Sequence, residues 1–488
     1  MKNYLTIVIS FLIVYSLPAT IVDTPLSNLS QAEKSFLLGQ YYQSTKSYKA
    51  DLLSSQKEKI LLYNIGYIYY LQNRNDSANY YANQALKYTP RYGPALYLAG
   101  LLAKERSDTQ EAENFFFRSI RHHPDPEFPL FELGLLYYHQ NNYEEAIDYF
   151  EAALKASDIF SFPYPFIANC YNQLGRTTTA IKTLEKGLEL SYDAEILTTL
   201  IQLYNKAGEL QKAKKYSGIF NFLFPEHSDA QYYKDQYPES DITNGFRSIP
   251  VRRSAFLPVG EKILYNVTLG PLKVGELYTA ILDTLTYNNT EVYKVRFSLD
   301  SNPDLAFAAV LHSDYISYIN KYTKQVELHY LHTWENDKIW DKLYEFDRKN
   351  HKFICRTVRK DGHIDIIEKY LPRNTIDGTS ILFYARQIAK EKRSERVMTI
   401  IDENFVISDI NYPDKIETIK VRGEPEKCIM IDGTNHYKGI VGFTGDFRGW
   451  FRDNEELLPV ASDFKIWVGR IKVKMASVEE QRVHKYAR

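Results

Sequence analysis

A single helix-packing pattern recurs five times in the first half of the chain and limits what that half can fold into. The copies are spaced by 34, 34, 34 and then 33 residues, and each carries an alanine twelve residues after its reference position. A fixed period of this length predicts stacked helical hairpins, in which small residues stand where two helix backbones come closest. The reference positions are Gly66, Gly100, Gly134, Ala168 and Ile201, and the alanines are Ala78, Ala112, Ala146, Ala180 and Ala213.

The third copy shows the pattern most clearly. Leu133-Gly-x-x-Tyr137 is followed by Ala146-x-x-x-Phe150-x-x-Ala153, and these residues resemble the signature of the tetratricopeptide repeat family. The copies begin near residues 59, 93, 127, 161 and 194. We expect a solenoid over 29–235, with five clear repeats from about 59 to 225 after a degenerate N-terminal cap. The resemblance implies a scaffold for protein–protein interaction.

The first residues have the pattern of an export signal. Lys2 gives a short positive start, and Leu5–Leu17 is an almost wholly apolar run that is too short to cross a bilayer as a helix. We expect a signal peptide over 1–20 and a location in the periplasm or cell envelope. Leu17 fits poorly into a cleavage site near Ala19 or Thr20, so an uncleaved anchor stays open as an alternative. Beyond the signal, the sequence predicts no transmembrane segment.

The pattern changes after the helical half. Residues 236–255 are polar without a helical period, which indicates a linker, and 479–488 form a tail. Residues 256–478 contain short β-rich runs, with a strong hairpin signal at Lys360-Asp-Gly362 and one expected helix near 378–390. The predicted fold class is a multidomain α + β protein. An all-α solenoid precedes an antiparallel, curved or barrel-like β domain with one helix.

Three motifs in the β-rich half resemble a bacterial envelope family known only as a domain of unknown function, DUF-3108. They are Phe256–Glu276, Asp377–Arg386 and Gly445–Val460, in that order along the chain. The resemblance implies an exported β domain and assigns no chemistry to any residue.

Composition and reactive motifs argue against several classes of function. The formal net charge of −1 leaves no bulk electrostatic signature for nucleic acid. His329 and His332 form an H-x-x-H, but on a strand they point to opposite faces, so we expect exposed or edge histidines and no metal site. Three cysteines without paired spacing predict buried thiols. We expect no catalytic residues, no cofactor and no nucleic-acid partner.

Repeat phase supplies the candidate binding site. In the repeat family, certain positions of each first helix face a concave channel, and here they pass from aromatic to amide side chains. Aromatic rings give contact area at low entropic cost, and amides pair with an extended peptide backbone. The alternative is that some rings only pack against the chain's own linker or β domain. The predicted groove residues are Tyr63, Tyr67, Tyr70, Tyr97, Leu101, Phe131, Leu135, Tyr138, Asn169, Asn172, Gln202 and Asn205.

These observations predict a non-catalytic, exported envelope protein whose repeats bind a protein or peptide partner, or dock onto its own β domain. One alternative is a carrier that holds a lipid or another apolar ligand inside the curved sheet. An enzyme is the less favoured alternative, because no convergent set of acid, base or nucleophile can be assembled from the sequence.

Overall fold

The computed structural model describes Leu26 and residues 29–53, 57–238, 257–302, 311–335, 338–436, 443–466 and 469–479. The predicted signal peptide at 1–20 lies outside these residues, as do most of the predicted linker and tail. In the described part of the chain, no helix has the length and apolarity needed to cross a membrane.

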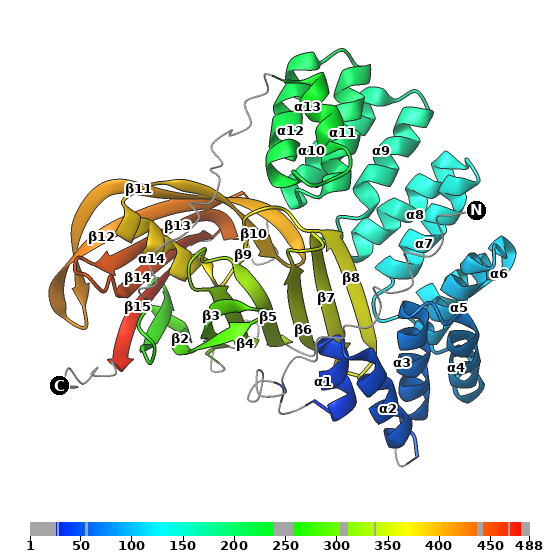
Figure 1. The fold of residues 1–488 in the computed structure, drawn as a ribbon, viewed down its shortest axis with the longest axis horizontal. Coiled ribbons are helices and arrows are strands. Elements are labelled where there is room, and N and C mark those ends of the chain that lie inside the picture. Colours follow the sequence, from blue (N-terminus) through cyan, green and yellow to red (C-terminus); the bar gives the residue numbers. More distant parts are fainter. Residues whose placement is uncertain are drawn as a thin grey trace. The chain divides into compact units, whose positions relative to one another are not determined.

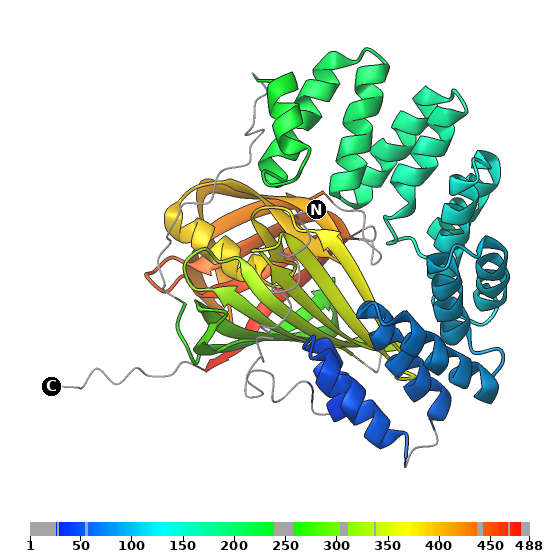
Figure 2. The ribbon, with the colours of Figure 1, turned by 45° about the vertical axis from the view of Figure 1, so that its right-hand side comes forward.

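Helices occupy the first half of the chain, as the repeat pattern predicts, and follow one another as antiparallel pairs (Figures 1 and 2). The first pair, α1 and α2, is shorter than the others. The bounds are α1 Gln31–Leu37, α2 Tyr41–Asp51, α3 Glu58–Leu71, α4 Asn75–Tyr88, α5 Gly93–Glu105, α6 Thr109–Ile120, α7 Glu127–His139, α8 Tyr143–Ala156, α9 Pro163–Gln173, α10 Thr177–Leu190, α11 Ala194–Lys206, α12 Leu210–Leu223 and α13 Ala230–Gln236.

The repeat period reflects two local requirements. At the centre of a hairpin, a Cβ added to Gly134 would lie 2.5 Å from the ring of Phe150, so the first helix can approach the second only with glycine here. At the turn, one residue of each hairpin takes a left-handed backbone conformation that favours glycine and asparagine. These turn residues keep the same period, and they are Asn73, Ser107, Asn141, Gly175 and Gly208.

The described residues of the second half form one sheet of 15 strands and a single helix, α14 (Ile381–Glu391). Described neighbours pair antiparallel except β9 and β10, which are parallel. The bounds are β1 Lys262–Leu269, β2 Leu272–Tyr287, β3 Thr290–Ser301, β4 Leu311–Asn320, β5 Val326–Glu335, β6 Lys338–Asp347, β7 Lys352–Arg359, β8 Ile364–Tyr370, β9 Thr375–Asp377, β10 Glu395–Ile401, β11 Asn404–Val421, β12 Glu424–Asn435, β13 Phe443–Arg452, β14 Pro459–Ile466 and β15 Gly469–Glu479.

The described strands confirm the expected antiparallel β domain with one helix, and because the sheet is open, a closed barrel is not formed. The strand order is β8-β7-β6-β5-β4-β3-β2-β1-β15-β14-β13-β12-β11-β10-β9, with β8 and β9 at its two ends. Most strands that follow one another in sequence are neighbours in the sheet. The exceptions among the described strands are β8 and β9, which lie at opposite ends, and the β1–β15 pairing joins distant parts of the domain. The predicted Lys360-Asp-Gly362 hairpin is confirmed between β7 and β8, where Gly362 has a φ of 93°.

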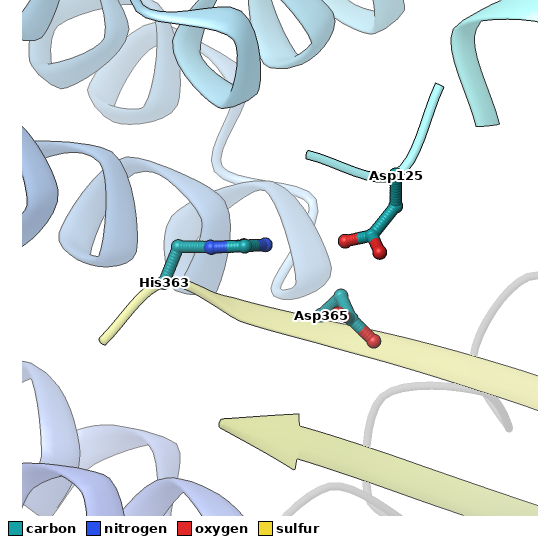
Figure 3. A group of neighbouring side chains, drawn as sticks. All are labelled: Asp125, His363 and Asp365. Atoms are coloured by element: carbon teal, nitrogen blue, oxygen red, sulfur yellow. The ribbon is translucent and has the colours of Figure 1, made fainter. Parts of the chain in front are cut away.

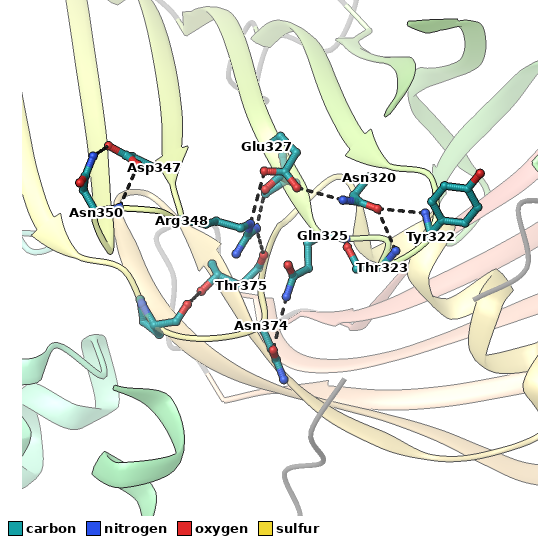
Figure 4. Close-up of polar contacts among 12 residues, drawn as sticks. Asn320, Tyr322, Thr323, Gln325, Glu327, Asp347, Arg348, Asn350, Asn374 and Thr375 are labelled. Atoms are coloured by element: carbon teal, nitrogen blue, oxygen red, sulfur yellow. Dashed lines mark hydrogen bonds and ion pairs between the residues drawn. The ribbon is translucent and has the colours of Figure 1, made fainter. Parts of the chain in front are cut away.

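Polar contacts hold the short end strand β9 beside the β4–β5 turn (Figure 4). Arg348 donates hydrogen bonds to the carbonyl oxygens of Val326 and Thr375. Its guanidinium also lies 3.5 Å from the carboxylate of Glu327. The charge of this half-buried arginine is stabilised because one side chain contacts several acceptors at once.

Helix α14 packs against the sheet with its apolar face. Ile388 and Ala389 join the core formed with strands β10–β14, and Phe383 reaches a second cluster with Ile281 and Val295. Arg386 on the same helix is fully buried and forms a two-pronged ion pair with Glu261 at 2.8 and 3.0 Å. The helix thus contacts both early and late strands. This packing gives no support to the expected apolar ligand inside the sheet.

The chain divides into two compact units, and each is described separately below. The first contains Met1–Pro124 together with Trp340–Leu343 and Arg356–Ile366, so the tip of the β7–β8 hairpin belongs with α1–α6. The second contains Asp125–Ile339, Tyr344–Cys355 and Ile367–Arg488.

Candidate functional site

In the first unit, the predicted groove of the first repeat holds a segment of the chain itself. The segment is the hairpin tip, Arg356–Ile366. Tyr63 Oη donates a hydrogen bond to the carbonyl oxygen of Ile364 at 3.0 Å. Its neighbour Asn64 donates from Nδ2 to the carbonyl oxygen of Gly362 at 2.8 Å. Two consecutive side chains of α3 therefore hold alternate backbone carbonyls of the hairpin, as a bound peptide would be held.

Tyr67 continues this contact one helical turn later. Its side chain is 6% exposed, and it forms a hydrogen bond with the backbone of Ile366. Burial raises the pKa of both Tyr63 and Tyr67 well above the usual tyrosine value, so both remain neutral hydrogen-bonding groups. Arg356 at the other end of the tip donates to the carbonyl oxygen of Leu37, at the end of α1.

The remaining groove positions of the first unit lie beside this contact. Tyr70 is half-buried and stacks on Tyr67 with 6.4 Å between ring centroids. Tyr97 is half-buried and meets His123 edge-to-face at 5.6 Å, while Leu101 is buried. Of the first-unit positions, Tyr63, Tyr67 and Leu101 are thus buried within the unit, while Tyr70 and Tyr97 keep intermediate exposure.

In the second unit, the aromatic groove positions are partly accessible. Phe131 packs at the centre of a ring cluster, with centroids 5.6 Å from Phe150 and 5.5 Å from Phe166. Tyr138 meets Phe166 edge-to-face at 5.7 Å. Phe131, Leu135 and Tyr138 all keep intermediate exposure. They form an apolar patch of the kind that partner residues cover.

The predicted amide positions follow this patch but already bond to neighbouring side chains. Asn172 Oδ1 accepts a hydrogen bond from Lys206 at 2.7 Å, and Asn205 Oδ1 accepts one from Tyr237. Gln202 is exposed and bonds to Tyr233, while Asn169 has intermediate exposure. The expected amide ladder is therefore interrupted in its last repeat by tyrosines of α13 and the residue after it.

Loops of the fourth and fifth repeats contact the β domain within the second unit. Lys369 Nζ lies 3.2 Å from the carboxylate of Asp193 and 2.9 Å from Ser161 Oγ, and both members of the ion pair are buried. The Tyr192 amide donates to the Phe405 carbonyl oxygen at 2.7 Å. Sequence reasoning missed these residues because a lone lysine in a strand or a loop aspartate carries no signal of its distant partner.

A basic pocket of about 510 Å³ opens in the first unit between the ends of the repeat helices and the hairpin tip. Its wall contains a lysine from the first turn of α3, arginines from two loops between helices, and one carboxylate, Asp361. His363 approaches that carboxylate with its Nδ1 at 2.5 Å. The lining residues are Lys59, Thr89, Arg91, Tyr92, Pro94, Arg121, His122, His123, Pro124 and Asp361.

A second pocket, of about 310 Å³, lies between α10 and the α11–α12 turn in the second unit. Its charges are mixed: Glu209 pairs with Lys212 at 2.7 Å, and Glu185 accepts a hydrogen bond from Tyr204. Internal pairing leaves little net charge to attract a ligand.

His329 is buried in the β domain, so its expected exposure is wrong. It is 3% exposed, its Nδ1 lies 2.8 Å from Ser317 Oγ, and the same nitrogen lies 3.6 Å from the carboxylate of Asp377. Burial lowers the pKa of His329 despite the nearby Asp377. A catalytic triad needs the hydroxyl and the carboxylate on opposite ring nitrogens, and here both approach Nδ1. The arrangement is that of a buried polar network.

His363 and Asp365 also combine groups that often bind metals, at the start of β8 (Figure 3). Each already has a charged neighbour, since His363 faces Asp361 and Asp365 accepts a hydrogen bond from Arg359 at 2.9 Å. Asp125, drawn in the same figure, belongs to the second unit. Two ligands within one unit fall short of the three or four that zinc sites use.

Comparison with protein families agrees with both resemblances. Residues 264–476 match the family described as "Protein of unknown function (DUF3108)", and residues 128–158 and 166–193 match tetratricopeptide repeat models. The chain combines tetratricopeptide repeats with a DUF3108 domain. No curated protein sequence matches the chain.

Several solved helical-repeat structures are similar to part of the chain. PilW, a widely conserved type IV pilus biogenesis factor, is 21% identical, with a TM-score of 0.38, over 41% of this chain and 94% of its own. PilF of Pseudomonas aeruginosa is 15% identical, with a TM-score of 0.38, over 42% and 94%. YrrB, a TPR protein with an unusual peptide-binding site, is 16% identical, with a TM-score of 0.32, over 39% and 99%.

Proposed function

We propose that this tetratricopeptide–DUF3108 protein is an exported, non-catalytic scaffold of the cell envelope that binds a protein partner. The partner site consists of the apolar patch of the third repeat, formed by Phe131, Leu135 and Tyr138, and of Asn169 in the fourth repeat. The observation that carries the proposal is that the groove side chains Tyr63 and Tyr67 of the first repeat hold the hairpin tip, whereas those of the third repeat keep intermediate exposure.

That difference in exposure supports a partner-binding surface on the third and fourth repeats. In the first unit the groove side chain Tyr63 and its neighbour Asn64 hold the hairpin tip, which indicates that this part of α3 suits an extended backbone. In the second unit the aromatic patch keeps intermediate exposure. Aromatic anchors beside a polar amide are typical of surfaces that contribute strongly to protein binding.

The absence of catalysis is part of the proposal. The buried His329 network lacks the geometry of a nucleophilic site, because serine and aspartate share one ring nitrogen. Export is proposed from the positive start and short apolar run of residues 1–20.

Quantitative co-purification tests the partner site. Tyr138→Ala with Asn169→Ala removes an anchor and an amide from the partner site, whereas Tyr88→Ala with Asn83→Ala removes the same chemistry from exposed positions of α4. We expect the same recovered proteins to fall at least fivefold with the first pair and to stay unchanged with the second. Equal recovery with both pairs would contradict the patch.

A reporter fusion tests export separately. Residues 1–30 joined to alkaline phosphatase should give periplasmic enzyme activity, and replacing Leu12 and Ile13 with aspartate should abolish it, because a charged run is not recognised as a signal. If the wild-type fusion gave no periplasmic activity, export would be contradicted, and the proposal for the binding surface would be unaffected.

A further inference from the structure

We infer that the basic pocket of the first unit is a binding site for a phosphoryl dianion. The pocket is separate from the proposed partner patch, and its residues are outside the predicted groove. Its volume of about 510 Å³ lies within the range of small-ligand sites.

Charge is the first argument. Lys59, Arg91 and Arg121 supply three permanent cations, and Asp361 is the single carboxylate in the wall. The wall therefore carries two more positive than negative charges, which matches the two negative charges of a phosphoryl dianion. A carboxylate ligand, with one negative charge, would neutralise only half of this excess. Arginine also matches phosphate geometry with two parallel N–H donors.

The origin of the charges on the wall supports a ligand role. Arg91 and Arg121 follow the ends of α4 and α6, where helix dipoles favour cations whether or not a ligand binds. Lys59 differs, because it lies in the first turn of α3, where the dipole disfavours a cation. Pro94 opens α5 at the same wall, so two positive helix ends meet the pocket.

A buried hydroxyl gives an independent indication. Tyr92 lines the pocket and is 8% exposed, and its hydroxyl lacks a hydrogen-bond partner among the described residues. Burial and the charge of Asp361 raise its pKa, so the group remains a neutral donor. A buried donor left unpaired costs free energy that a bound oxyanion would recover.

Calorimetric titration of the full chain tests the site with three probes. These are inorganic pyrophosphate, acetate, and vesicles of phosphatidic acid in phosphatidylcholine, with pure phosphatidylcholine vesicles as the blank. Phosphatidic acid is chosen because its phosphomonoester headgroup can carry two negative charges. We expect saturable binding of a phosphoryl probe, and binding of acetate that is at least tenfold weaker. Arg91→Gln with Arg121→Gln should weaken phosphoryl binding about tenfold or more, because each lost contact is a charge-assisted hydrogen bond.

Lys87→Gln with Lys155→Gln is the matched control. It removes the same charge from exposed positions in the last turns of α4 and α8, outside the pocket. Binding of pyrophosphate alone would identify a soluble ligand, and binding of the anionic vesicles alone would identify a lipid headgroup. The inference would be overturned if neither pyrophosphate nor the anionic vesicles bound, or if acetate bound with equal affinity. An equal loss of binding in the control variant would also overturn it.

Discussion

The first and the last repeats both contact the β half of the chain, but they do so with different parts of the same hairpin architecture. In the first unit, side chains from the interior of α3 hold the backbone of a hairpin tip. In the second unit, the loops between helices form a backbone hydrogen bond and a buried ion pair with the sheet. The repeat period specifies how the helices pack on one another. It does not specify which surface of a repeat contacts the β half of the chain.

The largest effect should come from the buried ion pair of the second unit. Lys369→Met leaves the Asp193 carboxylate buried without its cation, and we expect the free energy of unfolding to fall by about 3–5 kcal/mol. Guanidinium titration followed by circular dichroism measures it. Arg106→Met breaks the exposed pair with Glu111 and should cost at most about 1 kcal/mol.

A compensating variant sharpens this result. Lys369→Met combined with Asp193→Leu removes both charges, so most of the lost stability should return. A single Lys369→Met variant as stable as the wild type would show that the loops dock without this pair.

Replacing the central glycine of a hairpin should destabilise the third repeat more than the first. In Gly134→Ala, the added methyl would lie 2.5 Å from the Phe150 ring, and overpacking of this kind costs about 1–3 kcal/mol. In Gly66→Ala the nearest atoms are 3.2 Å away, so the gain in helix propensity, up to about 1 kcal/mol, should offset most of the cost. Thermal unfolding of the two variants compares them. Equal losses would mean that the two hairpins pack alike.

The contact of the hairpin tip should give a smaller and more local effect. Tyr63→Phe removes the hydrogen bond to Ile364 and should cost about 1 kcal/mol. Hydrogen exchange measured by mass spectrometry should then rise in residues 360–366 and stay constant in the second unit. Tyr80→Phe, at an exposed position of α4, is the control and should leave the exchange unchanged.

The smallest effect concerns thiol chemistry in the repeats and in the sheet. Burial raises the pKa of Cys170 to about 12 and that of Cys428 to about 11, so both stay neutral at pH 8. Below about pH 9 each thiol is neutral in both states, and its full contribution to the free energy of unfolding is present. Above about pH 9 the thiol ionises first in the unfolded state, so this contribution is lost as the pH rises toward the folded-state pKa values of about 12 and 11. A disulfide reagent at pH 8 should therefore label native protein far more slowly than unfolded protein. Rapid labelling of either thiol would contradict its burial.

Local sequence patterns predicted much of the architecture. Small residues at a fixed period determined the helical hairpins, because Gly134 can be replaced by few side chains where Phe150 packs. The Lys360-Asp-Gly362 turn and the helix near 378–390 were likewise predicted from local chemistry and confirmed. Burial of the three cysteines is confirmed too, and none of these described residues forms a disulfide.

The candidate site was less accessible to prediction. Repeat phase identified Tyr63 and Tyr67, and the alternative that such rings pack against the chain's own β domain holds for both. The sequence did not indicate which segment contacts them, a hairpin some 300 residues away along the chain. The basic pocket was missed for the same reason, because its cations come from separate segments, a helix start and two loops, that meet only after folding. His329 was misjudged because alternation along a strand gives its face but not what covers that face.

The sequence by itself determined the repeat register, the turns and the order of helices and strands, since these depend on interactions between residues close along the chain. Only the tertiary structure decided which groove positions are occupied, that the sheet stays open, and where basic side chains gather. Those outcomes depend on contacts between segments far apart in sequence, whose partners no local pattern specifies.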